Sequence, residues 1–264
     1  MSGVVMLTAA AAATLLQPTS KWIVDFDETQ CTASRDFGTA ERPLTLLLKA
    51  PVTGDVIQLF IARGALGTSV AQPLQATVSW GGAAPRKIDA LTFRAVTVKR
   101  QMFLINLPRT DVAAAAAAGA SDLKVDGLGL GFDFNLGPLA NMLKVMDSCV
   151  SDLATHWNYH DDKSGAADPL KTHAKGPLVR LFSSDDYPSD AVRNDQSGEV
   201  AAVLLINPDG KVADCTLTKT SGVAVLDAQT CAIVRDRARL QPAIGLDGKA
   251  ARDVYTYRVR WRMP

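Results

Sequence analysis

Short apolar runs separated by turn residues occupy the first part of the chain. The runs are WIVDF, LTLLLK, VIQLFIA, LQATVSW and TFRAVTV. They are rich in β-branched and aromatic residues, which favour strands, and turns with Gly or Pro separate them. The pattern therefore predicts a strand-rich region over residues 22–107.

Two helical patterns follow these strands. Asp111 to Ala120 begins with a residue that can cap a helix and continues with alanine, which has the highest helix propensity. Residues 138–157 repeat apolar side chains at intervals of three and four, as an amphipathic helix does. These side chains are Leu139, Met142, Leu143, Met146, Cys149, Val150 and Leu153. We expect this second helix to close a β-rich N-terminal domain, residues 21–157.

The segment 158–180 is polar and has no periodicity. It contains Gly, Pro and Asp, so we interpret it as a linker between domains. From residue 181 to the end, the order of patterns is strand, turn, strand, helix, strand. These elements are predicted at residues 199–206, 207–210, 211–220, 225–239 and 253–263. The chain is thus predicted to be α+β, with a β-rich N-terminal domain, a closing helix and a small ββαβ domain over 181–264.

Three of the four cysteines lie in predicted elements, and Cys31 lies in the region after the first predicted strand. Alternation along the return strand predicts that Ala213, Cys215 and Leu217 share one face, and the next helix carries Cys231, Val234 and Ala238 on its apolar side. If these faces pack together, Cys215 and Cys231 meet. Four cysteines allow three pairings. We prefer the disulfides Cys31–Cys149 and Cys215–Cys231, because each pair then lies within one predicted domain.

The N-terminus has the pattern of an export signal. Residues 1–20 contain an uncharged, mostly apolar run from Val4 to Leu16, and Ala11-Ala12-Ala13 fits a signal-peptide cleavage site. The run is too short to span a bilayer, so we expect no stable membrane span. A buried N-terminal helix is the alternative. The net charge of +1 gives no electrostatic reason to expect a nucleic-acid partner.

A set of motifs in the last part of the chain occurs in a characteristic order. They are Tyr187-Pro188 with Ala191, Gly198-x-Val200, Asn207-Pro208-Asp209-Gly210-Lys211-Val212, Ser221-Gly222 with Leu226-Asp227, and Arg239-Leu240-Gln241-Pro242-Ala243 with Asp247-Gly248-Lys249. Together they make residues 181–264 resemble the C-terminal domain of TonB-family proteins. Leu240 stands where an aromatic residue is usual in that family.

The resemblance implies binding in the Gram-negative periplasm rather than catalysis, with no cofactor and no metal. Founding members of the family couple inner-membrane energy to outer-membrane receptors by adding a receptor peptide to a sheet edge. In this sequence the corresponding edge is the final strand, and the implied partner-binding residues are Tyr187, Pro188, Tyr257, Arg258, Arg260 and Arg262. The partner is expected to be an envelope protein or peptide, with TonB-dependent receptors as candidates. The plainer interpretation of the arginines is a solvated face that discourages aggregation.

Energy transducers of this family carry an N-terminal membrane anchor and a long Pro-rich spacer. Neither pattern is present in the sequence, so we expect the recognition module to stand on an exported scaffold. Residues 22–157 are weakly similar to small exported β-rich domains of alphaproteobacteria, and this similarity carries no activity with it.

An enzymatic alternative rests on residues 22–29, WIVDFDET. The D-x-D-x-T spacing resembles the first motif of haloacid-dehalogenase-type phosphatases, in which Asp25 would be the nucleophile and Asp27 the acid/base. That chemistry needs Mg²⁺ on a parallel sheet, so the alternative function is a metal- or Asp-dependent hydrolase. The all-β pattern that follows favours a first strand ending in a polar turn.

Overall fold

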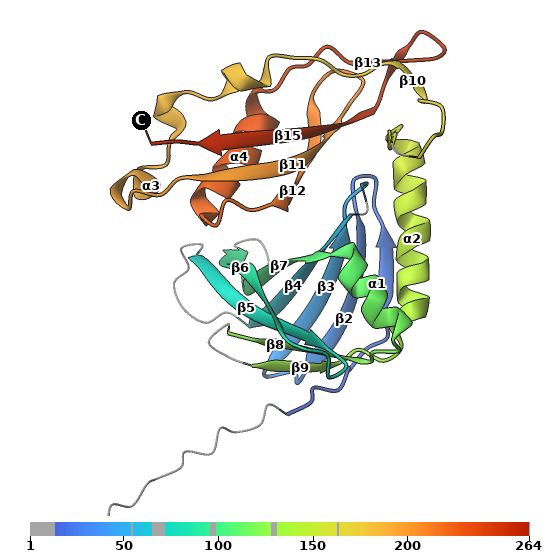
Figure 1. The fold of residues 1–264 in the computed structure, drawn as a ribbon, viewed down its shortest axis with the longest axis vertical. Coiled ribbons are helices and arrows are strands. Elements are labelled where there is room, and N and C mark those ends of the chain that lie inside the picture. Colours follow the sequence, from blue (N-terminus) through green and yellow to red (C-terminus); the bar gives the residue numbers. More distant parts are fainter. Residues whose placement is uncertain are drawn as a thin grey trace, which may run out of the picture.

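The computed structural model describes residues 14–53, 55–64, 72–95, 99–127, 131–162 and 164–263. The fold is α+β with strands predominating. Figure 1 shows the N-terminal half, residues 14–157, below the C-terminal half, residues 158–263. The expected signal segment 1–20 lies mostly outside the described residues.

The N-terminal half contains one curved antiparallel sheet of nine strands. Their spatial order is β1-β2-β3-β4-β7-β6-β5-β8-β9. The strands are β1 Ile23–Phe26, β2 Cys31–Gly38, β3 Pro43–Ala50, β4 Val56–Gly64, β5 Gln72–Trp80, β6 Arg86–Ala95, β7 Arg100–Pro108, β8 Asp122–Asp126 and β9 Phe132–Asn135. Along β3, every second side chain is buried, because one face of the sheet covers the core.

The chain before β1 connects the two ends of this sheet. The backbone N–H of Leu16 donates to the carbonyl of Asp133 in β9 (2.6 Å), and the N–H of Thr19 donates to the carbonyl of Asp36 in β2 (2.8 Å). Residues 16–19 are therefore part of the folded structure.

Two helices complete the N-terminal half, α1 Arg109–Ala117 and α2 Leu139–His156. The apolar face predicted for α2 is buried in the core, apart from Val150, which is partly buried. A disulfide between Cys31 and Cys149 joins β2 to α2. Just past the helix, the indole of Trp157 is buried and donates to the carbonyl of Glu28 (2.6 Å). The second predicted helix and its disulfide are thus present at the expected positions.

The C-terminal half contains two three-stranded sheets. One has the order β12-β11-β15, and the other β10-β13-β14. The strands are β10 Leu170–Thr172, β11 Gly198–Ile206, β12 Val212–Lys219, β13 Ala243–Gly245, β14 Ala250–Ala251 and β15 Asp253–Trp261; the helical segments are η1 Leu178–Leu181, η2 Ser184–Asp186, α3 Ser189–Arg193 and α4 Ala224–Arg237. Strand β10 lies within the segment expected to be a linker.

Strand β11 is buried on both faces. Its side chains alternate between two cores: Leu204 and Ile206 pack with α4, whereas Val203 and Leu205 pack into the core of the N-terminal half. Val254 of β15 also packs against the N-terminal core. The sheet β12-β11-β15 is therefore covered by α4 on one face and partly by the N-terminal half on the other.

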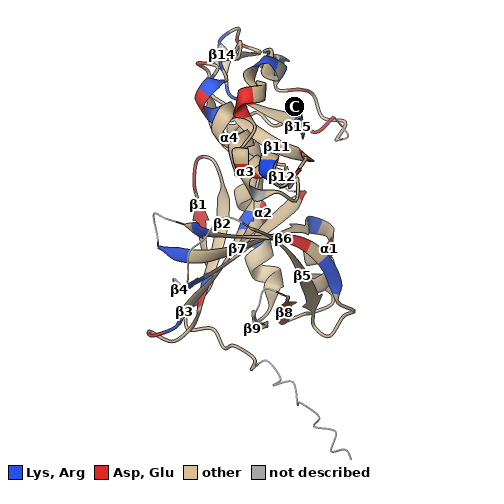
Figure 2. Ribbon diagram, turned by 90° about the vertical axis from the view of Figure 1, so that its left-hand side faces the viewer, with Lys and Arg blue, Asp and Glu red and all other residues tan. Residues whose placement is uncertain are grey.

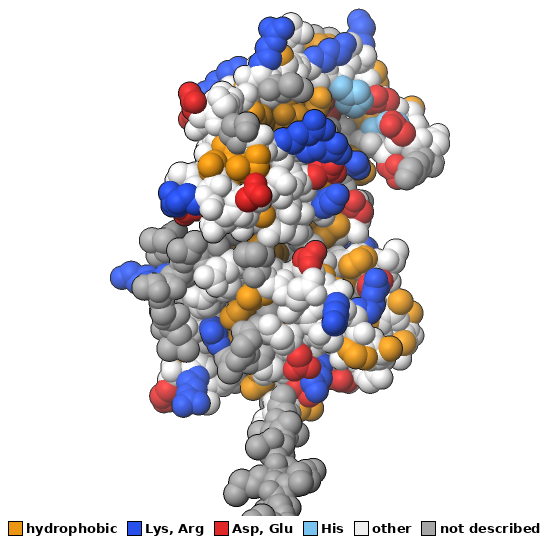
Figure 3. Space-filling model, turned by 60° about the vertical axis from the view of Figure 1, so that its left-hand side comes forward, with side chains coloured by type: hydrophobic (Ala, Val, Ile, Leu, Met, Phe, Trp, Pro, Cys, Tyr) orange, Lys and Arg blue, Asp and Glu red, His pale blue; other side chains and the backbone are white. Residues whose placement is uncertain are grey.

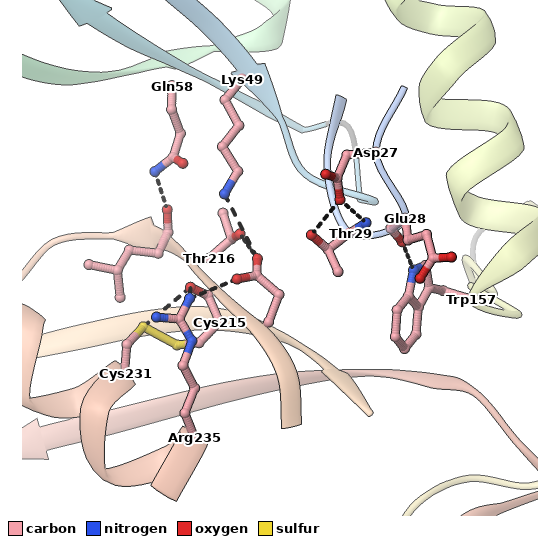
Figure 4. A network of polar contacts seen from close by, with 12 residues as sticks. Asp27, Glu28, Thr29, Lys49, Gln58, Trp157, Cys215, Thr216, Cys231 and Arg235 are labelled. Carbon is pink, nitrogen blue, oxygen red and sulfur yellow. Dashed lines mark hydrogen bonds and ion pairs between the residues drawn. A yellow bond between two sulfur atoms is a disulfide. The ribbon is translucent and has the colours of Figure 1, made fainter. Parts of the chain in front are cut away.

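Polar contacts surround this interface between the halves (Figure 4). The ammonium group of Lys49 lies 3.8 Å from one carboxylate oxygen of Asp214. The other oxygen of Asp214 accepts a bond from Arg235 (2.7 Å). Gln58 donates to the carbonyl of Leu217 (3.0 Å). Burial lowers the pKa of Lys49, and the positive charge of Arg235 acts in the same direction. The contacts of Lys49 and Gln58 join β3 and β4 of the N-terminal half to β12 of the C-terminal half.

One predicted strand face is wrong. Ala213 was expected to share a face with Cys215 and Leu217, but Ala213 packs against the N-terminal core while the other two pack with α4. The register of β12 against β11 shifts between Asp214 and Val212, because a bulge inserts an extra residue there. The disulfide Cys215–Cys231 still joins β12 to α4, as expected.

The Ser-Gly and Leu-Asp motifs have a structural role in the described fold. Asp227 is buried in the first turn of α4. Its carboxylate accepts bonds from the backbone and hydroxyl of Ser221 (2.8 and 2.7 Å) and from the hydroxyl of Thr220. Burial raises the pKa of Asp227 even though these donors oppose the shift. The motif therefore ties the end of β12 to the start of the helix.

Candidate functional site

Strand β15 forms an edge of the C-terminal sheet. It pairs with β11 from Asp253 opposite Ile206 to Trp261 opposite Gly198. Within the described ranges, no strand pairs with the opposite edge of β15. An edge of this kind presents unpaired N–H and C=O groups. The N-terminal half packs against a face of the sheet, through Val203, Leu205 and Val254, and not along this edge.

One face of β15, called here its basic side, carries arginine side chains. Arg258 and Arg260 in the strand, and Arg262 directly after it, are all exposed. The guanidinium of Arg260 bonds to Glu199 of β11 at 3.0 Å, and Lys219 of β12 bonds to the same carboxylate at 3.2 Å. The bond from Arg260, followed by that from Lys219, lowers the pKa of Glu199. A shallow hollow of about 490 Å³ lies over these arginines.

The other side of β15 is aromatic. The ring of Phe182 stacks on Tyr257 with 6.2 Å between centroids, and it meets the indole of Trp261 edge-on at 5.5 Å. Tyr187 also meets Trp261 edge-on, at 5.4 Å, and its hydroxyl donates to the carbonyl of Gln196 (2.6 Å). Burial raises the pKa of Tyr257 to about 12. Both tyrosines therefore stay protonated across physiological pH.

The structure divides the six predicted partner-binding residues between these two sides. Tyr187, Pro188 and Tyr257 lie on the aromatic side or next to it, whereas the three arginines project from the opposite side. Sequence reasoning did not assign Phe182, Trp261 or Glu199 to the site. Trp261 lies four residues after Tyr257, so alternation along the strand puts both on one face, but nothing local indicates that Phe182 packs there.

An ion pair holds the segment before α3 against α4. Arg237 donates two bonds to the carboxylate of buried Asp186, at 2.8 and 2.6 Å. These bonds, together with one from the backbone N–H of Ser183, hold the pKa of Asp186 well below its usual range. The contact positions Phe182 and Tyr187 beside β15.

A second ion cluster ties residues 168–173 to the start of β15. The two ring nitrogens of His173 lie 3.0 Å from Asp253 and 2.9 Å from Asp168. Asp253 is buried and also accepts the N–H of Ala174 (2.7 Å). Both ring nitrogens face carboxylates, which only the protonated imidazole satisfies by donating twice. Burial opposes this charge, but the bonds to Asp253 and Asp168 outweigh it, so the pKa of His173 is raised.

We expect His173→Gln to lower the melting temperature more at pH 5.5 than at pH 9. A histidine whose pKa is higher in the folded than in the unfolded protein stabilises the fold fully at pH values below its unfolded-state pKa of about 6.5. This stabilisation is lost as the pH rises through the pKa of the folded state. The difference should be small, roughly 1–2 °C, because the His173 side chain is 46% exposed and water screens the pair. Thermal unfolding at both pH values measures it.

The matched control for this experiment is His160→Gln. His160 lies 3.6 Å from an Asp162 side chain that is fully exposed. The loss should differ less between the two pH values for His160→Gln than for His173→Gln, because His160 lies beside one solvent-exposed carboxylate, whereas both ring nitrogens of His173 face carboxylates. An equal loss for His173→Gln at pH 5.5 and pH 9 would contradict the charged pairing.

The residues of the enzymatic alternative lie on an antiparallel hairpin. Asp25 is in β1 and faces Thr32 of β2. Asp27 accepts bonds from the backbone and hydroxyl of Thr29 (3.0 and 3.2 Å) within the turn that follows. The phosphatase motif needs a parallel strand followed by a helix, and β1 does not provide that setting. The described residues contain no group of three or more His, Cys, Asp or Glu that could hold a metal.

Charged residues are distributed over both halves, as Figure 2 shows. On the face seen in Figure 3, basic, acidic and hydrophobic side chains are interspersed. None of the helices in the described part of the chain is long and apolar enough to span a membrane.

Residues 184–263 match the family model described as Gram-negative bacterial TonB protein C-terminal. This segment, which contains β15 and the residues around it, is a TonB-family C-terminal domain. The resemblance found in the motifs is confirmed for these residues. The comparisons with curated proteins and with solved structures gave no match.

Proposed function

We propose that the protein is a non-enzymatic envelope protein that binds an extended protein or peptide segment at the edge of β15. The observation that supports this most directly is one edge of the nine-residue strand β15, in the TonB-family segment, with which no strand of the described residues pairs. The backbone groups of an added strand supply affinity, and side chains on alternate faces supply specificity. The proposed contacts are Tyr187, Pro188, Tyr257, Arg258, Arg260 and Arg262.

The role we propose is in TonB-dependent outer-membrane transport, with a TonB-dependent receptor as the partner. The proposed location is the periplasm, after removal of an N-terminal signal. Cleavage after Ala13 would leave the paired residues 16–19 in the mature chain. The two disulfides agree with an oxidising compartment. We also keep, as a proposal, the division into residues 21–157, a connecting segment 158–180 and a domain over 181–264.

Hydrogen exchange of the full chain tests the proposed edge. Synthetic peptides from the periplasmic segments of TonB-dependent receptors are added in excess, and amide exchange is followed by mass spectrometry. We expect exchange to slow in residues 253–261. It should stay unchanged in β1, which is an edge strand of the nine-stranded sheet. Protection confined to other segments, or no protection with any receptor peptide, would contradict the proposal.

A further inference from the structure

A row of charges with alternating sign crosses the C-terminal sheet. It runs from Lys219 in β12 through Glu199 in β11 to Arg260 in β15. The Glu199 carboxylate bonds to both cations, at 3.2 and 3.0 Å, and Glu199 is directly opposite Arg260 in the strand register. The row therefore ends in a cation at the unpaired edge.

Two further cations extend this edge along the strand. Arg258 lies two residues before Arg260, and Arg262 two residues after it, so the three project on the same side. Among the described residues, neither Arg258 nor Arg262 forms an ion pair. The only acidic side chain of these residues that lines the hollow is Glu199, which pairs with Arg260. The hollow is lined by three arginines, one glutamate and Val259, which leaves an excess of positive charge beside the edge.

The opposite side of the same strand is apolar. Tyr257, Val259 and Trp261 face the core under α4, and Phe182 lies against two of them. A strand added to this edge would place successive side chains alternately on the basic and on the apolar side. Its residues on the basic side would lie directly beside the arginines, within the range of cross-strand pairing.

A second copy of the chain does not fit this edge. Pairing two β15 strands edge to edge would bring two rows of arginines together, and like charges that face each other across strands are destabilising. The edge is thus protected against self-association while it remains open to a chain of opposite charge.

This inference rests on the proposed edge binding. We propose that the partner segment carries acidic residues at alternate positions, i, i+2 and i+4, with apolar residues between them. The acidic side chains continue the charge row beyond Arg260 and pair with Arg258 and Arg262. The apolar side chains lie beside Tyr257 and Trp261.

Fluorescence anisotropy with the full chain and labelled nine-residue peptides tests this pattern. One peptide has Glu at odd and Val at even positions, and a second replaces each Glu with Gln. A third has the Glu sequence with N-methylated backbone amides, which cannot form strand pairs. At low salt we expect the Glu peptide to bind about tenfold more tightly than the Gln peptide, which corresponds to about 1.4 kcal/mol. The advantage should shrink as salt screens the exposed pairs.

The double variant Arg258→Glu, Arg262→Glu should abolish this preference while leaving the Arg260–Glu199 bond in place. The control is Arg94→Glu, a charge reversal at an exposed position of β6, which should retain the preference. Circular dichroism before titration establishes that each variant is folded.

The outcomes separate the two proposals. Equal binding of the Glu and Gln peptides, together with protection of β15, would overturn the acidic pattern and leave edge binding intact. Absence of binding by both peptides at millimolar concentration would overturn the pattern, and edge binding would then depend on the receptor peptides alone. Equally tight binding of the N-methylated peptide would show attraction without strand pairing and would overturn the pattern too.

Discussion

Replacing Cys31 and Cys149 with alanine is expected to lower the free energy of unfolding by about 5 kcal/mol in the chain-entropy model. The bond closes a loop between residues 118 apart in sequence, and a long loop loses the most unfolded-state entropy when it is closed. Both cysteines are buried in the core, so alanine leaves no unpaired polar group. Urea unfolding followed by tryptophan fluorescence measures the loss, with buried Trp157 as the reporter nearby.

The second disulfide provides the control for this prediction. Cys215 and Cys231 are only 16 residues apart, and the same model assigns their bond about 3 kcal/mol. The variant without Cys31–Cys149 should therefore unfold at the lower urea concentration. If the variant without Cys215–Cys231 lost as much unfolding free energy as the other, or more, the entropy of the unfolded chain would not be the main contribution of these disulfides to stability.

Gly210→Ala is expected to destabilise the protein by about 2–5 kcal/mol. Gly210 has φ +78°, and a Cβ added there would lie 1.9 Å from the carbonyl oxygen of Leu240. The left-handed backbone costs an L-residue about 1–2 kcal/mol, and forcing the neighbouring chain apart adds about 1–3 kcal/mol. The clash also breaks the bond from the N–H of Leu240 to the Gly210 carbonyl (2.9 Å). Thermal and urea unfolding both report the change.

Gly222→Ala separates the two causes. Gly222 has nearly the same φ, +79°, but no atom lies within 4 Å of its added Cβ. Its substitution should therefore cost only the backbone part, about 1–2 kcal/mol. If the two variants were equally stable, close packing of the turn against Leu240 would not be the reason for glycine at position 210.

Local patterns predicted part of the elements: the apolar runs identified β1, β3, β4 and β5, but β2, β7, β8 and β9 were not predicted. The spacing of Leu139, Met142 and Met146 indicated α2, and the final strand was predicted close to the observed β15. Both signals depend only on neighbouring residues and on one buried face. The turn at 207–210 was also predictable, because proline fixes its own φ at position 208 and glycine accepts a positive φ at position 210.

The arrangement of the elements was not predictable from these patterns. The run VAAVLLI predicted a strand, but it does not say that Val203 and Leu205 meet the N-terminal half while Leu204 and Ile206 pack with α4. A bulge beside Ala213 shifted its side chain to the other face, and no residue in the strand signals that shift. His173 looked like part of a polar linker, because its partners Asp168 and Asp253 are brought together only by the tertiary fold.

The apolar face shared by Val203, Leu205 and Val254 has a consequence for dissecting the protein. A fragment that began at residue 181 would lose the N-terminal core that covers these side chains. The newly exposed surface would favour aggregation, since contiguous apolar patches on soluble proteins attract one another. The TonB-family segment of this chain is therefore expected to be poorly soluble in isolation, unlike a module that evolved to stand alone.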